Sequence, residues 1–271
     1  MYKIARMGWL PDPMDHRDLA VSSPIVKAAK ANTSQESKRV MGASPKANKS
    51  KVDLRRYCSP IEDQGDIGSC TAQSAAGLLE FLWRQTIDEP VDASRLFIYK
   101  ATRNLLGWSG DTGAFVRETI KAIRLFGACP ESHWPYETEA FDDEPPAFCY
   151  AYANNFKALV YYRLEPTIAE LEKSLAAGIP FAFGFSCFAS IDDFDVSRTG
   201  HIPFPKKRDK NVGGHAVMCV GFDRKAKHFI IRNSWGEGWG DGGYGYLPYE
   251  YFTKGLADDC WAVVKSDYEG L

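Results

Sequence analysis

The chain has 271 residues, and its 33 Lys and Arg against 35 Asp and Glu leave a formal net charge of −2. Hydrophobic residues make up 45% and charged residues 25% of the sequence, which is typical of a soluble globular protein with one large domain or two lobes. The near-neutral charge excludes a general electrostatic attraction to nucleic acid or acidic membranes. No run of about 18 apolar residues occurs, so the sequence predicts no transmembrane helix.

Seven cysteines are scattered along the chain without a Cys-x-x-Cys pair, so the sequence gives no support for a zinc site. The N-terminus reaches Pro11 and Asp12 too early for the apolar core of a signal peptide. We therefore expect reduced thiols and a cytoplasmic protein, with secretion without a visible signal as the alternative.

Three regions differ in composition. Residues 1–21 form an N-terminal peptide with two prolines and the apolar residues Trp9 and Leu10. Residues 22–51 are rich in Ser, Lys, Ala and Asn and predict a flexible linker, because they cannot bury enough apolar surface to offset their ordering entropy. Residues 52–271 have globular composition, and we divide them into a helical lobe over about 60–158 and a strand-rich lobe over about 159–263.

Three helices are predicted from apolar residues that recur every three or four positions. The first begins at Cys70 and continues beyond Leu82. The second covers residues 113–127 and stops at Gly127, and the third covers residues 167–178. The small residues at the start of the first helix suggest that another element packs closely against it.

The later part of the chain predicts strands at residues 180–188, 215–223, 227–235 and 242–248. Helices come first and strands later, which indicates an α+β protein with two unlike lobes.

The middle two of these strands flank a polar turn and predict a hairpin in which His215 and Asn233 face each other. A histidine held by an amide suits a cysteine nucleophile. The imidazole accepts the thiol proton, and the amide oxygen fixes the orientation and tautomer of the ring.

Cys70 could supply that nucleophile, because it stands where the first helix begins. A helix N-terminus or a histidine cation lowers the pKa of a thiol from its usual value of about 8.5. Gln64 precedes Cys70 by six positions and could donate a side-chain N–H to an oxyanion, together with the backbone N–H of Cys70.

Three blocks carry a family resemblance: QGDIGSCTAQSAA, GGHAV and RNSWGEGWGDGGYGY. In this order they resemble the signature blocks of the papain family of cysteine peptidases, and VDLRRYCSPIEDQG resembles the beginning of the mature enzyme in that family. The resemblance covers residues 52–271. It implies a papain-like two-lobed fold, with a helical lobe, a β-barrel-like lobe and the active-site cleft between them.

By match to these blocks, Cys70 is the nucleophile, His215 the general base and acid, Asn233 the residue that orients the ring, and Gln64 the oxyanion donor. The resemblance thus implies a thiol protease, a cysteine endopeptidase that hydrolyses peptide bonds in peptides or proteins. It implies no cofactor and no metal. Trp235 would shield the histidine–asparagine pair from water.

The sequence departs from the family pattern at three positions. Ile67 stands where the family usually has a cysteine, so a familiar disulfide is missing. Thr71 follows the nucleophile in place of an aromatic residue, and Gly214 precedes the histidine in place of Asp or Asn. About fifty atypical residues also stand where the family has a long helical pro-region.

The resemblance also suggests which residues bind substrate. These are Gly68, Ser69, Gly214 and Trp235 beside the catalytic residues, and Gly110, Asp111 and Thr112 where the family has a glycine-rich segment that pairs with substrate backbone. Asp259 falls on the floor of the second subsite, or Asp258 if the register slips by one. A carboxylate in an apolar pocket favours a cation, so we expect a preference for a basic substrate residue. The alternative is that both aspartates face solvent.

Other functions stay open at this point. One is a catalytically silent peptide-binding protein on the same fold, and another is a Cys–His acyltransferase or transglutaminase. The N-terminal peptide should lie in or over the cleft and inhibit the enzyme as a zymogen, with docking elsewhere or disorder as the alternative. The basic run from Lys206 to Lys210 predicts a solvated loop, with an anion or nucleotide contact as the alternative. We expect a monomer.

Overall fold

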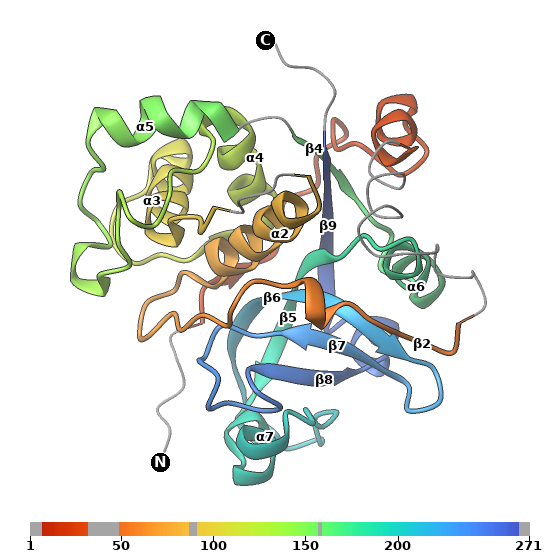
Figure 1. Cartoon of the computed structure of the whole chain (residues 1–271). Helices are drawn as coiled ribbons and strands as arrows, with labels where there is room; N and C mark the ends of the chain where they lie inside the picture. The colour runs from red at the N-terminus through yellow and green to blue at the C-terminus, as the bar shows by residue number, and fades with distance from the viewer. Residues whose placement is uncertain (1–6, 32–48, 87–90, 157–158, 266–271) are drawn as a thin grey trace.

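The computed structural model describes residues 7–31, 49–86, 91–156 and 159–265. In Figure 1, a group of helices gathers on one side of the molecule and the strands of a large sheet on the other. These helices are α2 (Cys70–Thr86), α3 (Arg95–Leu106), α4 (Val116–Phe126) and α5 (Ala147–Ala153).

The second side is a seven-stranded sheet with the order β4-β9-β5-β6-β7-β8, in which β2 pairs with β6. Its strands are β2 (Lys51–Asp53), β4 (Leu159–Arg163), β5 (Phe181–Phe188), β6 (Asn211–Asp223), β7 (His228–Arg232), β8 (Tyr244–Pro248) and β9 (Ala257–Lys265). The helices α6 (Ile168–Ala176), α7 (Phe194–Thr199) and α8 (Glu250–Thr253) lie between strands in the chain. The helices α2 to α5 precede the long strands β4 to β9 in the chain, which confirms the predicted α+β class.

The helix α2 is almost completely buried, because α3, α4 and β6 all pack against it. Its small residues Ala72, Ala75 and Ala76 are buried and allow these elements to approach closely. Strand β5 is buried on both faces and reads as a continuous apolar run, as expected for a central strand. The first residue of α2, Cys70, therefore lies against the sheet.

The β6–β7 hairpin differs from the predicted register. Met218 lies opposite Arg232, and a bulge shifts the pairing nearer the turn. Asn233 directly follows Arg232, so it lies diagonally across from His215 instead of directly opposite it. Diagonal neighbours on adjacent strands remain within reach of each other.

Part of the predicted flexible linker is helical, over residues 24–31. Val26 is fully buried and Ala29 nearly so, and the Lys30 ammonium lies 5.2 Å from the centre of the Tyr162 ring. This short apolar face holds the helix on the protein. It was not predicted, because the average composition of the whole linker is polar. Residues 32–48 of the predicted linker lie outside the described residues.

Residues 7–21, here named the N-terminal segment, run across the protein before this helix. Strand β1 (Trp9–Leu10) pairs in parallel with β3 (Ala114–Phe115). Further along, the backbone N–H of Arg163 on β4 donates to Leu19 O at 2.8 Å. The segment thus bridges the helical side and the sheet.

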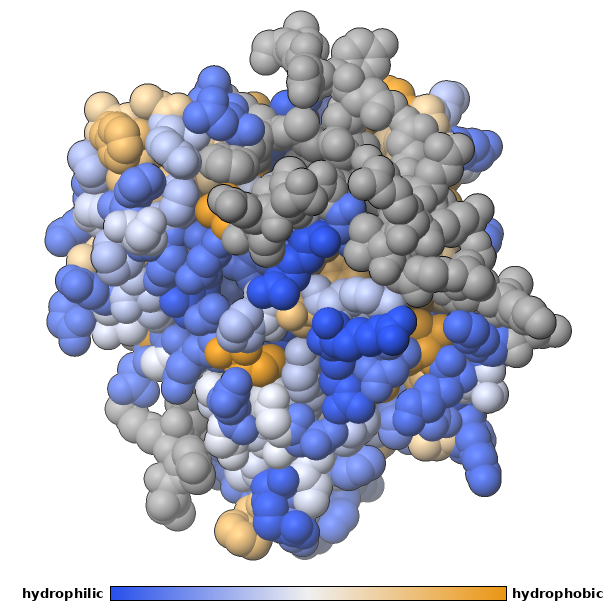
Figure 2. Space-filling view, in the orientation of Figure 1, coloured by the Kyte–Doolittle hydropathy of each residue, from blue (hydrophilic) through white to orange (hydrophobic). Residues whose placement is uncertain are grey.

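The face shown in Figure 2 is mainly hydrophilic, with apolar side chains in small separate patches among the described residues. Among the described helices, none has the length and apolar character needed to cross a bilayer.

Candidate active site

Cys70 is the first residue of α2 and is fully buried. Its sulfur lies beside the backbone N–H of Ala216 on β6 and that of Gly8 in the N-terminal segment. Burial raises the pKa of Cys70 to about 11, and these N–H groups act in the opposite direction. In this buried position the Cys70 side chain is therefore a thiol at neutral pH.

His215 precedes Ala216, and its Nε2 lies 2.7 Å from Asn233 Oδ1. Because an amide oxygen only accepts, this bond places the proton on Nε2 and leaves a lone pair on Nδ1. Nδ1 is buried and has no hydrogen-bond partner among the described residues. The Trp235 ring stacks on the imidazole with centroids 4.6 Å apart. Burial lowers the pKa of His215 to about 4, against the effect of the Asn233 bond.

Gln64 joins the loop before α2 to the loop after β7. Its backbone N–H donates to Ser234 O at 2.8 Å, and its side-chain Oε1 accepts from Ser234 Oγ at 2.7 Å. Its Nε2 donates to Ile67 O at 2.9 Å. Ser234 follows Asn233 in the chain, so these bonds fix the position of the nucleophile loop relative to the histidine–asparagine pair.

Two of the predicted substrate-binding residues lie on the loop before Cys70. The backbone N–H of Gly68 donates to Asp111 Oδ1 at 2.8 Å, and Gly68 faces the backbone of Gly8. Ser69 is buried and shares a 2.6 Å hydrogen bond with Tyr136 OH. Gly68 thus contacts the N-terminal segment, whereas Ser69 supports the loop from inside.

The backbone that pairs with the segment lies slightly beyond the predicted Gly110, Asp111 and Thr112. Ala114 N donates to Gly8 O at 2.8 Å, and a β-carbon on Gly113 would clash with that same oxygen. Asp111 supports this region by holding Gly68. The predicted residues lie on the same loop as this pairing, which the sequence pattern did not reveal at residues 113–115, and substrate binding there stays a prediction.

Beside this pairing, Thr112, Trp108 and Leu10 line a hollow of about 390 Å³. Gly110 lies outside it, where its N–H donates to Asp142 Oδ2 at 3.0 Å.

The indole of Trp9 occupies a pocket in which two glycines provide the necessary room. A β-carbon on Gly184 of β5 or on Gly214 of β6 would clash with this ring. The unusual glycine before His215 therefore makes space for a large side chain. The role of Gly184 could not be predicted, because a single glycine within a strand does not indicate a pocket for a neighbouring side chain.

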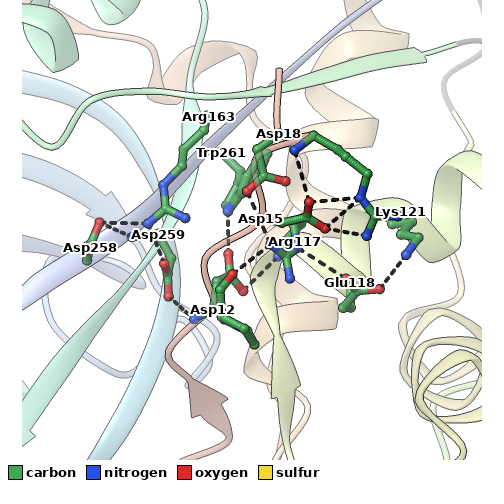
Figure 3. Close-up of polar contacts among 12 residues, drawn as sticks. Asp12, Asp15, Asp18, Arg117, Glu118, Lys121, Arg163, Asp258, Asp259 and Trp261 are labelled. Atoms are coloured by element: carbon green, nitrogen blue, oxygen red, sulfur yellow. Dashed lines mark hydrogen bonds and ion pairs between the residues drawn. The ribbon is translucent and has the colours of Figure 1, made fainter. Parts of the chain in front are cut away.

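Asp259 lies at the end of this pocket and is only 2% exposed, so the alternative of a solvent-facing aspartate is wrong for this residue. Its Oδ2 accepts from Trp9 Nε1 at 3.2 Å and from Asp12 N at 2.7 Å. Its Oδ1 accepts from Arg163 at 2.9 Å. Burial raises the pKa of Asp259 above its ordinary value. Figure 3 shows that Arg163 also contacts Asp258, which is exposed.

Two other expectations concern binding outside this site. A hollow of about 430 Å³ is lined in part by Lys206, Arg208 and Ser190, and the predicted anion contact there stays a prediction. Within the described ranges, no three His, Cys, Asp or Glu side chains are grouped so that they could hold a metal ion.

Comparisons with known proteins agree with this geometry. The family model described as papain family cysteine protease matches residues 48–263. An uncharacterized peptidase C1-like protein of Acanthamoeba polyphaga mimivirus is 34% identical over 274 residues, covering 94% of this chain and 86% of that protein. Cathepsin K of Gallus gallus is 30% identical over 201 residues, covering 71% of this chain and 57% of that relative. The crystal structure of xylellain, a cysteine protease from Xylella fastidiosa, is similar with a TM-score of 0.79 and 36% identity, covering 99% of this chain and 100% of that chain.

Displacing the N-terminal segment should raise the pKa of His215. In the wild-type chain we expect a neutral imidazole down to about pH 4, because burial lowers its pKa to about 4. Gly8→Ala adds a β-carbon that clashes with Gly68 O, so it should displace the segment, return the imidazole to water and raise the His215 pKa well above 4. An NMR titration of the imidazole signals measures this change. Met14→Ala, at a fully exposed residue of the same segment, is the control. Identical His215 titrations in wild type and Gly8→Ala would contradict the prediction.

Proposed function

Since the chain belongs to the papain family of cysteine proteases, we propose that this cysteine peptidase uses Cys70 as its nucleophile and His215 as its general base and acid. The observation that carries the proposal is the 2.7 Å bond between His215 Nε2 and Asn233 Oδ1, beside a cysteine at a helix N-terminus. Peptides or proteins are the substrates that this family implies.

The proposed reaction is hydrolysis of an internal peptide bond in two stages. His215 takes the thiol proton, and the Cys70 sulfur attacks the scissile carbonyl carbon. The Gln64 amide and the backbone N–H of Cys70 stabilise the oxyanion. His215 then protonates the leaving amine, which breaks the C–N bond and leaves an acyl-enzyme. A water molecule activated by His215 releases the acid and restores the thiol.

Two substitutions test these roles. Cys70→Ala should fold but show no peptide hydrolysis, and Gln64→Ala should fold and lose about 10²–10³ in kcat, the usual cost of one oxyanion donor. Cys149→Ala, at another buried free cysteine, is the matched control and should keep its activity. Circular dichroism checks folding, and a fluorogenic peptide reports kcat. Full activity in Cys70→Ala would refute the assignment.

The alternative functions predict other outcomes. A silent binding protein would bind peptide without turnover in the wild type as well as in Cys70→Ala. An acyltransferase would transfer the acyl group to an added amine in preference to water, which product analysis by mass spectrometry would detect.

We further propose that the N-terminal segment inhibits the enzyme. The segment covers the nucleophile, because Gly8 lies against both the Cys70 sulfur and Gly68. Trp9 fills the adjoining pocket between Gly184 and Gly214. Cys70 and His215 are at most 1% exposed in this arrangement, so a substrate can reach the thiol only after the segment moves.

Gly8→Ala should therefore raise peptidase activity in the full-length chain. A point substitution is preferable to deletion of the first 51 residues, because deletion would also remove the buried contact of Val26. We expect a higher kcat/KM for a small fluorogenic peptide in Gly8→Ala, and no change in Met14→Ala. Equal kcat/KM in Gly8→Ala and wild type would rule out inhibition by the segment.

The second subsite is proposed to prefer a basic substrate residue. When Trp9 and Asp12 leave, Asp259 Oδ2 loses both of its N–H donors and faces the vacated pocket. Arg163 contacts both Asp258 and Asp259, and its single positive charge neutralises only one of these two negative charges. A substrate arginine would supply both the missing donors and a positive charge.

The subsite preference can be measured with two fluorogenic dipeptides that carry arginine or phenylalanine at the position second from the cut. The Gly8→Ala background keeps the site open. We expect the arginine substrate to be preferred, and Asp259→Ala to remove this preference while changing turnover of the phenylalanine substrate little. Asp258→Ala, at the exposed neighbour, should retain the preference. If the Gly8→Ala enzyme, with Asp259 intact, prefers the phenylalanine substrate, the proposal is wrong.

A further inference from the structure

The N-terminal segment places a half-buried carboxylate, that of Asp12, at the edge of the active site. Asp12 Oδ2 accepts from the indole Nε1 of Trp261 at 2.6 Å, and its Oδ1 accepts from the backbone N–H of Arg117 at 3.3 Å. Both donors are neutral groups. The same residue donates its backbone N–H to Asp259 Oδ2, so closure brings two carboxyl groups together (Figure 3).

The charged groups around Asp12 are mostly engaged with one another. On β9 and β4, Arg163 pairs with Asp259 at 2.9 Å and with Asp258 at 3.3 Å. On α4, Arg117 pairs with Glu118 at 3.2 Å and with Asp18 of the segment at the same distance. The remaining charged groups in this region are Asp15, Arg17 and Lys121.

Arg163 therefore directs its close contacts to other carboxylates, and Arg117 directs its own to Glu118, to Asp18 and to Pro13 O at 2.8 Å. Asp12 enters the cluster with uncharged hydrogen-bond donors and with the charge of Asp259 nearby. A carboxylate that loses water in such surroundings favours its protonated form. The pKa of Asp12 rises to about 7 because of burial first and the charge of Asp259 second, against the effects of Trp261 and Arg117.

We propose that the N-terminal segment closes the active site by taking up a proton at Asp12, so that closure tightens in mild acid and loosens above neutral pH. This inference rests on the proposed inhibitory role of the segment, and it identifies a signal that controls that role.

The direction follows from proton linkage. The pKa of Asp12 is about 7 in the closed state, and its ordinary value of 3.8 applies once the segment is in water. The closed state therefore binds more protons between these two values, and closure strengthens by up to tenfold for each pH unit of acidification. Between pH 8.0 and pH 5.5 the closure constant should change by about 30-fold.

The catalytic pair does not reverse this dependence. In the proposed open enzyme, Cys70 and His215 share one proton as thiolate and imidazolium. In the closed site the same proton resides on the sulfur and the imidazole is neutral, as their shifted pKa values require. Closure then moves a proton within the pair and exchanges none with solvent.

Alkylation of Cys70 by iodoacetamide tests the proposal in the full-length chain. Asp12→Asn keeps an oxygen that can accept from Trp261 and cannot titrate. The rate for wild type divided by the rate for Asp12→Asn cancels the pH dependence of the thiol itself. We expect this ratio to rise by about 30-fold from pH 5.5 to pH 8.0, with peptide mapping to locate the label.

Asp15→Asn is the matched control, because Asp15 lies on the same segment but pairs with Arg17, which lowers its pKa. The alkylation rate of wild type divided by that of Asp15→Asn should not change over the same pH range. Asp259→Asn provides a second measurement, because removal of the neighbouring charge should lower the Asp12 pKa and move the transition to lower pH.

The outcomes separate this inference from the function on which it rests. Gly8→Ala could be alkylated faster than wild type while the ratio of the wild-type rate to the Asp12→Asn rate does not change with pH. In that case the segment inhibits without proton uptake, and the inference is wrong. If Gly8→Ala is alkylated no faster at any pH, the proposed inhibition fails and the inference fails with it.

Discussion

Close packing of α2 against β6 is the interaction on which the rest of the structure depends. It requires small residues on α2, as Gly77 shows, because a β-carbon there would lie only 3.2 Å from the Met218 sulfur on β6. The packing sets the Cys70 sulfur beside the Ala216 N–H, although the two residues are far apart in the chain. Once this contact is fixed, His215 needs only its bond to Asn233 to orient the ring.

The proposed catalytic residues, which the structure brings together, could be selected from the sequence because each lies in a short block whose chemistry is local. The helices α2, α4 and α6 were predicted for a similar reason, since their apolar faces are uninterrupted. In contrast, α3 was missed because Lys100 and Arg103 break its apolar pattern. Both side chains are buried through ion pairs with Asp142, a residue about 40 positions later that the local pattern does not reveal.

Long-range pairing also explains what could not be anticipated around Asp259. Strand β4 pairs with β9 and brings Arg163 to the aspartate from 96 residues away. No spacing rule connects these positions. The helix at residues 24–31 escaped notice for another reason, because its buried contact depends on very few apolar side chains in an otherwise polar stretch.

That helix has a consequence for the proposed release of the segment from the active site. Buried Val26 keeps the helix on the protein, so a released segment stays attached to the molecule that it covered. Return is then a unimolecular step, and a short flexible tether presents its ligand at an effective concentration in the millimolar range. Dilution of the protein leaves this local concentration unchanged. A single cut in the chain between the segment and the helix would abolish this local concentration and would make the proposed opening irreversible.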